Sequence, residues 1–284
     1  MRLSVFTSIL LFAFVGAVGG CSGSERLTYD GPKEAYTKGI SQFEEGDYKL
    51  AVRFFRGVLE YGRGNKWAAN AQYKLAMAQR KRGKHLVAAS EFKRFTEIYR
   101  NSAKVAEAQF ERANSYYLRS PMYRLDQSDS RQAISLFQLF IDQHPNHRLV
   151  PEAEKKIDEL RAKLAHKKYA AAQLYEQREM WQAATEVYVD AFNKYPDTKW
   201  ADEVLLGAVR SYVQYADRSI QKKQAERYRK AIKYYNRLTQ LFPESKLLSR
   251  AEELYSEAQR KLERVQAQED EQSLARDGGS RGSR

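Results

Sequence analysis

The sequence predicts an all-α protein, a solenoid of about five helix pairs, and three observations support that prediction. Its 284 residues include only 6 prolines and 15 glycines, whereas helix-favouring Ala, Leu, Gln, Glu, Lys and Arg are frequent. Five alanines are each followed four residues later by an aromatic ring. In the last three copies a proline, which cannot continue a helix, stands twelve residues after the alanine.

The alanine and the ring of each copy lie one turn apart on the same helical face. A small alanine lets two helices approach closely, and the ring fills the space beside it. This pattern is typical of the second helix of a tetratricopeptide (TPR) unit. It assigns ten residues to the repeat core: Ala51, Phe55, Ala88, Phe92, Ala133, Phe137, Ala184, Tyr188, Ala231 and Tyr235.

The spacing between the five alanines varies, so the later units carry insertions. A cluster of turn formers around Pro121 predicts a long loop within the third unit, and the segment 147–178 is long enough for one extended connecting helix. We expect no strand. The predicted organisation is repeats 1–3 at 32–146, then the connecting helix, repeats 4 and 5 and a capping helix at 147–266, and a disordered tail at 267–284.

The N-terminus has the features of an export signal. Arg2 precedes an apolar run that is too short for a membrane-spanning helix, so residues 1–20 are predicted to be a signal peptide. The run ends in Val18-Gly19-Gly20-Cys21, which resembles the lipobox of bacterial lipoproteins. We therefore expect Cys21 to be lipidated and residues 21–31 to form a linker. Acyl chains would hold the protein to a bilayer without spanning it.

Cys21 is the single cysteine of the chain, which excludes disulfides and Cys-ligated metal sites. Ser22 follows it where an inner-membrane retention signal usually has Asp, so the resemblance implies the periplasmic face of the outer membrane. A net charge of +13 would suggest a nucleic-acid partner, but an exported protein does not encounter nucleic acid in its normal function. Anionic protein, lipid or cell-wall surfaces are the expected partners. The basic stretch 62–104 fits either a solvated face or a binding site.

This sequence offers no candidate residues for a catalytic site or a metal site. The four histidines do not form a ligand set, since His144 and His147 share a loop without a third ligand nearby. Phosphate-binding, nucleophile-elbow and His-Glu-x-x-His motifs are missing. We expect a non-enzymatic protein with no cofactor beyond the covalent N-terminal acyl and diacylglyceryl groups.

In a TPR unit, positions 2, 5, 9 and 12 of the first helix face a concave groove. In repeats 1–3 these positions supply a candidate peptide groove: Tyr36, Phe43, Asn70, Tyr73, Arg80, Phe110, Asn114 and Tyr117. Asparagine amides can donate to and accept from an extended backbone, and an arginine can hold a terminal carboxylate. Aromatic residues at helical spacing also fit a repeat core, so both interpretations stay open.

The chain also resembles a known family. The segments SPMYRLDQSDSRQAISLFQLFIDQHP at 120–145 and RSIQKKQAERYRKAIKYYNRLTQLFPES at 218–245, together with the lipobox, resemble the BamD lipoproteins of the outer-membrane β-barrel assembly machinery, in their Bacteroidetes-like form. The similarity covers about residues 30–265.

The resemblance implies a non-catalytic subunit. Its C-terminal repeats would dock on the periplasmic POTRA domains of the barrel-shaped core subunit, BamA, and its N-terminal repeats would receive unfolded outer-membrane proteins. Accessory lipoproteins would complete the complex. Two other classes remain open: a TPR lipoprotein adaptor for peptidoglycan-processing enzymes or proteases, and a lipid-modified enzyme on a helical scaffold.

Overall fold

The computed structural model describes residues 27–281, with side chains as far as residue 272. The predicted signal peptide and Cys21 lie outside these residues. The described chain is all-α, with eleven helices and no strand. The helices are α1 Pro32–Glu44, α2 Tyr48–Glu60, α3 Ala68–Lys81, α4 His85–Ile98, α5 Val105–Arg119, α6 Ser128–Gln143, α7 Val150–Gln177, α8 Trp181–Lys194, α9 Ala201–Asp217, α10 Gln221–Leu241 and α11 Leu248–Arg281.

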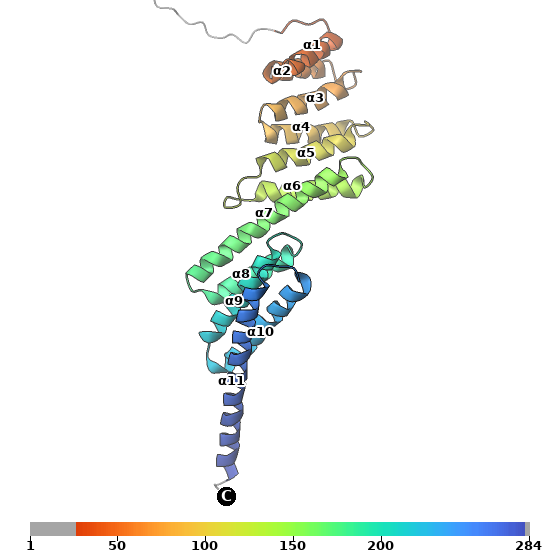
Figure 1. Ribbon diagram of the computed structural model, residues 1–284. Coiled ribbons are helices and arrows are strands. Elements are labelled where there is room, and N and C mark those ends of the chain that lie inside the picture. The colour runs from red at the N-terminus through yellow and green to blue at the C-terminus, as the bar shows by residue number, and fades with distance from the viewer. Residues whose placement is uncertain (1–26, 282–284) are drawn as a thin grey trace, which may run out of the picture.

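Each helix packs against the next one in the chain, which produces the elongated stack of Figure 1. The pairs α1–α2, α3–α4, α5–α6, α7–α8 and α9–α10 correspond to the five predicted units, and α11 covers the last pair. The all-α, TPR-like prediction is therefore confirmed.

The alanine and ring positions form the contact surface within each pair. Nine of the ten predicted core residues have no exposed surface. Tyr235 differs, because it is half-buried and its ring stacks on Tyr255 of α11 with a centroid distance of 4.2 Å. The last ring therefore packs between the fifth unit and the capping helix.

The two helices of a unit are joined by tight turns in units 1, 2 and 4. Gly46 and Gly83 take left-handed conformations there, with φ of 88° and 71°. Each stands five residues before its repeat alanine, and Glu179 takes the same place in unit 4 with φ of 55°. A side chain in this conformation costs about 1–2 kcal/mol relative to glycine. The turn is thus imposed by helix packing even where glycine is lacking.

Helix α7 connects the two groups of repeats. It has 28 residues and runs diagonally across Figure 1. Its first half contributes Ala153, Ile157 and Leu160 to the core of unit 3, and its second half contributes Ala172 to the core of unit 4. The predicted connecting helix is therefore also the first helix of the fourth unit.

The insertions take two forms. In unit 3 the extra residues form an irregular loop at 120–127, as predicted. In unit 5 they lengthen the helices, so that only residues 218–220 separate α9 from α10. The tail differs from the prediction, because α11 continues past residue 266 to Arg281. No proline interrupts this segment, and its Glu, Gln, Arg and Ala residues favour helix without needing an apolar face.

Truncation of a core ring should strongly destabilise the solenoid. For Phe55→Ala, Phe92→Ala and Phe137→Ala we expect a loss of about 3–5 kcal/mol in the free energy of unfolding, because apolar contacts are replaced by a cavity. Urea denaturation measures this loss. Leu139→Ala is the control, since Leu139 is 46% exposed on α6 and its truncation should cost little. A loss below about 1 kcal/mol at all three rings would contradict the repeat register.

Candidate peptide groove

The groove begins with an aromatic pair at its N-terminal end. Tyr36 of α1 stacks on Trp67, the residue before α3, with a centroid distance of 5.2 Å and an interplanar angle of 29°. About two turns further along α1, Phe43 packs edge-on against Tyr48. Tyr36, Phe43 and Trp67 are each partly exposed, so they offer ring surface to a ligand.

The second unit combines a ring with an amide. Tyr73 packs edge-on against Phe92 and Phe95, and burial and the nearby Glu111 raise its pKa to about 12. Lys104 Nζ donates to Asn70 Oδ1 at 3.0 Å. The carbonyl of Asn70 is therefore engaged within the protein, while its NH₂ group has no hydrogen-bond partner among the contacts of the described chain.

Arg80 and Asn114 meet at Glu111 of α5. Arg80 Nη1 lies 2.7 Å from Glu111 Oε2, and Asn114 Nδ2 donates to the same oxygen at 3.1 Å. The side chains of Arg80 and Glu111 are only 17% and 16% exposed. A peptide carboxylate at Arg80 would have to compete with Glu111. Asn114 is 8% exposed and its Oδ1 is a buried acceptor without a partner.

Two of the predicted groove residues make contacts within the protein that the sequence did not predict. Phe110 is 3% exposed and packs against Phe137 and Phe140, so it belongs to the core of unit 3 and not to the groove surface. Tyr117 is partly exposed, but its hydroxyl donates to Glu159 of α7 at 2.5 Å. This bond and partial burial raise the Tyr117 pKa to about 12.

The groove continues into α7, which the sequence analysis missed. Tyr36 and Tyr73 each stand 15 residues before their repeat alanine, and Tyr169 stands 15 residues before Ala184. The same register places His166, Gln173 and Glu176 on this face of unit 4. Counting back from Ala184 would have found them. The groove face is therefore formed by α1, α3, α5 and α7.

Glu176 closes the groove at its C-terminal end. Its carboxylate accepts hydrogen bonds from Tyr188 at 3.0 Å, from Arg210 at 2.7 and 3.0 Å, and from Ser211 at 2.7 Å. Burial, followed by the Glu176 charge, raises the pKa of Tyr188 far above its usual value. All these groups form hydrogen bonds with one another, so this end of the groove has a structural role.

Lysines cover the rings along the groove face. Their Nζ atoms lie 4.2–5.6 Å from ring centroids, in the pairs Lys66–Trp67, Lys74–Phe43, Lys104–Tyr73 and Lys156–Tyr117. The first three lysines come from the basic stretch 62–104, while Lys81, Lys84, Lys93 and Arg94 of the same stretch are solvent-exposed. Part of the stretch is thus a groove wall and part a solvated face.

Within residues 27–281, no helix combines the length and the apolar character needed to cross a bilayer. Among the same residues, no group of three or more His, Asp or Glu side chains is placed to hold a metal ion.

Loss of the Glu111 charge should weaken the contact between units 2 and 3. We expect Glu111→Gln to lower the free energy of unfolding by about 1–3 kcal/mol, because it leaves the largely buried guanidinium of Arg80 without its counter-ion. Glu97→Gln is the matched control, since the Lys93–Glu97 pair is more than half exposed and should contribute under about 1 kcal/mol. Equal effects in the two variants, measured by urea denaturation, would contradict a structural role for the Arg80–Glu111 pair.

Comparisons with known proteins agree with this architecture. The family model described as YfiO, outer membrane lipoprotein, matches residues 29–226, and a tetratricopeptide repeat model matches residues 219–245. Outer membrane protein assembly factor BamD of Pasteurella multocida is 25% identical over 215 residues, which cover 72% of this chain and 82% of that protein. The BamD of Haemophilus influenzae is 26% identical over 204 residues, covering 68% and 78%.

Among solved structures, a TPR repeats protein from Bacteroides fragilis aligns over 82% of this chain and all of its own, with a TM-score of 0.46 and 16% identity. The match of the YfiO model extends through four of the five helix pairs and into the fifth. The chain therefore belongs to the YfiO family of outer membrane lipoproteins.

Proposed function

We propose that this protein is a lipid-anchored subunit of the outer-membrane β-barrel assembly machinery, on the periplasmic face of the outer membrane. It scaffolds a BamA-like barrel subunit through the POTRA domains of that subunit, and it receives unfolded outer-membrane proteins for insertion. The observation that carries this proposal is the family match over residues 29–226, with curated relatives that are named as outer membrane protein assembly factors.

The groove face supports the substrate role. Partly exposed rings at Tyr36, Trp67 and Tyr73 suit the apolar side chains of an extended segment, and the free NH₂ of Asn70 suits a backbone carbonyl. An unfolded β-strand presents both kinds of group, because its backbone has not yet found a partner strand. We therefore assign substrate binding to the first-helix face of repeats 1–3.

The C-terminal repeats are the proposed docking region for the core subunit. Helix α10 carries seven Lys or Arg residues against Glu226 alone. Lys222, Arg229 and Lys233 are exposed on it. Such a surface favours an acidic partner and would steer its approach. Because α7 separates these repeats from the first three, the two binding functions should be separable by mutation.

Anchoring has a direct test. We expect Cys21→Ala to give a folded protein in the soluble periplasmic fraction, because acyl chains on Cys21 are the proposed attachment. Membrane fractionation measures the distribution, and cells depleted of the core subunit remove the second route of attachment. If the variant still sediments with the outer membrane in those cells after a high-salt wash, lipid anchoring at Cys21 is wrong.

Partner recovery from detergent extracts tests the assembly role itself. Stoichiometric recovery of a large outer-membrane barrel subunit is the expected result. Recovery of peptidoglycan hydrolases, proteases or glycan in its place would favour the adaptor function, and turnover by the isolated protein would favour an enzyme.

Peptide binding should depend on Asn70. We expect Asn70→Ala to weaken binding of a peptide copied from the C-terminal strand of a barrel protein by about two- to ten-fold, the equivalent of about 0.5–1.5 kcal/mol for one hydrogen bond. Capture of the core subunit should stay unchanged. Asn101→Ala, in the exposed turn before α5, is the control. Unchanged peptide affinity in a fluorescence titration, or loss of the core subunit together with the peptide, would contradict the division of functions.

A further inference from the structure

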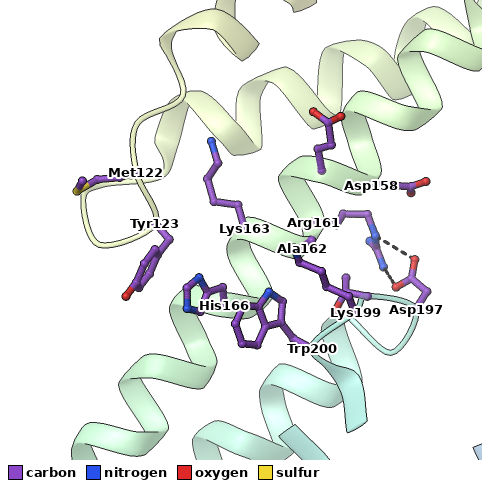
Figure 2. Close-up of a pocket in the computed structure, with 12 residues that line it drawn as sticks. Met122, Tyr123, Asp158, Arg161, Ala162, Lys163, His166, Asp197, Lys199 and Trp200 are labelled. Carbon is purple, nitrogen blue, oxygen red and sulfur yellow. Dashed lines mark hydrogen bonds and ion pairs between the residues drawn. The ribbon is translucent and has the colours of Figure 1, made fainter. Parts of the chain in front are cut away.

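A cavity of about 580 Å³ lies beside the middle of α7 (Figure 2). Its floor is the turn of α7 that carries Ala162, Lys163 and His166. One wall is the loop of unit 3 with Met122 and Tyr123, and the other is the α8–α9 connection from Asp197 to Trp200. The cavity lies along α7, which is about twice as long as a first helix of units 1–3, between the half that packs in unit 3 and the half that packs in unit 4.

Three rings form a continuous stack along this cavity. The centroid of His166 lies 3.8 Å from that of Tyr123 and 4.0 Å from that of Trp200, and the imidazole and indole planes differ by only 8°. We call Tyr123, His166 and Trp200 the central aromatic site. Met122 at its rim is 64% exposed, so apolar and aromatic surface faces an open space.

The loop that carries Met122 is held rigidly by polar side chains. Gln127, which is 1% exposed, donates to the carbonyls of Met122 and Leu125 at 2.9 and 3.1 Å. Lys163 Nζ donates to Ser120 Oγ at 2.6 Å, and Lys167 Nζ donates to the carbonyl of Leu125 at 2.6 Å. These bonds hold the backbone of the loop in place, which lowers the entropy cost of binding a partner there.

The central aromatic site resembles the N-terminal aromatic site formed by Tyr36 and Trp67. Trp67 lies in Asn65-Lys66-Trp67-Ala68 and Trp200 in Thr198-Lys199-Trp200-Ala201, and each tryptophan directly precedes the first helix of a unit. Each one stacks on a ring from the first helix of the preceding unit. The groove face thus carries the same tryptophan–lysine element twice.

The charges nearest His166 are those of Lys199 and Arg124, which are positive. Glu159 also lines the cavity, and its carboxylate accepts a hydrogen bond from Tyr117. Burial, together with Lys199 and Arg124, lowers the pKa of His166, so the imidazole is neutral at neutral pH. Arg161 and Asp197 form a two-bond ion pair that neutralises both groups. Asp158, a lining carboxylate, lies across α7 from the Tyr123 ring in Figure 2. A ligand at the rings therefore meets apolar surface and positive charge together.

We propose that the central aromatic site is a second peptide-binding site of the groove, which takes an aromatic side chain next to a carboxylate from the same extended polypeptide that occupies Tyr36 and Trp67. This inference rests on the proposed function, since it assumes that the groove binds unfolded chains. Two linked contacts raise the effective concentration of the second one, so a chain with two aromatic–acidic clusters binds more tightly than a chain with one.

Tryptophan fluorescence tests the two sites separately, because the chain has three tryptophans, Trp67, Trp181 and Trp200. One variant keeps only Trp67, with Trp181→Phe and Trp200→Phe, and a second keeps only Trp200, with Trp67→Phe and Trp181→Phe. Both are titrated with a capped peptide that contains a Phe-Asp pair. We expect saturable emission changes in both variants and about ten-fold weaker binding of the matching Phe-Lys peptide to the Trp200 variant.

The outcomes separate this inference from the proposed function. If Trp67 responds and Trp200 does not, the second site is wrong while the groove of repeats 1–3 survives. If neither tryptophan responds, peptide binding by the groove fails as a whole. If vesicles of phosphatidylglycerol change the Trp200 emission and the peptide does not, the cavity binds lipid and the inference is overturned.

Point variants on the loop provide a matched control. Met122 and Leu125 are both exposed, and both carbonyls are held by Gln127, but only Met122 lines the cavity. In the Trp200 variant we expect Met122→Asp to weaken the Phe-Asp peptide about ten-fold through like-charge repulsion, and Leu125→Asp to leave its affinity unchanged. Lys199→Glu should also weaken binding of the Phe-Asp peptide. If Met122→Asp and Leu125→Asp bind the Phe-Asp peptide with equal affinity, and their circular dichroism spectra are unchanged, the proposed site is wrong.

Discussion

The contact between a small alanine and an aromatic ring one turn later determines the spacing of every helix pair in this protein. Because Ala51, Ala88, Ala133, Ala184 and Ala231 have no exposed surface, the two helices of each unit touch at the alanine, and the ring closes the space beside it. The turn geometry follows from this contact. Glu179 adopts a left-handed conformation at the place where units 1 and 2 have glycine, since the packing of α7 against α8 requires the same turn.

The sequence predicted most of this fold because the repeat pattern depends on short spacings within one helix. It predicted less where contacts between residues far apart in the chain determine the position of a side chain. The position of Phe110 within α5 did not show that its ring would pack against Phe137 and Phe140, nor did the sequence show that Glu111 would pair with Arg80 of the neighbouring unit. The central aromatic site joins residues 43 and 34 positions apart in the chain, so no local pattern indicates it. It becomes visible only when the loop and the α8–α9 turn are placed on either side of α7.

Helix α7 connects the two groups of repeats and also sets the distance between them. Ala153, Ile157 and Leu160 of its first half belong to the core of unit 3 and Ala172 of its second half to that of unit 4, so the two groups of repeats share one helix. The same length keeps them apart, and the cavity lies along the middle of α7. Around the unit 3 loop, Gln127 and Lys167 donate to carbonyl groups that have no helical partner.

The proposed binding of unfolded chains requires a strongly basic surface to accept apolar side chains, and the lysines over the groove rings are part of that surface. Lys66, Lys74, Lys104 and Lys156 each lie over a ring. Lys66 is the exposed one of the four, and an exposed contact of this kind is worth only about 0.5–1 kcal/mol, whereas Lys104 is also held by Asn70. An arriving aromatic side chain could therefore displace Lys66 from Trp67 at low cost, and a neighbouring carboxylate on the same chain could then pair with the displaced ammonium group. In the proposed groove, specificity would come from the order of aromatic and acidic residues along an extended segment. A binding face of this kind suits partners that share a pattern of side chains without sharing one sequence.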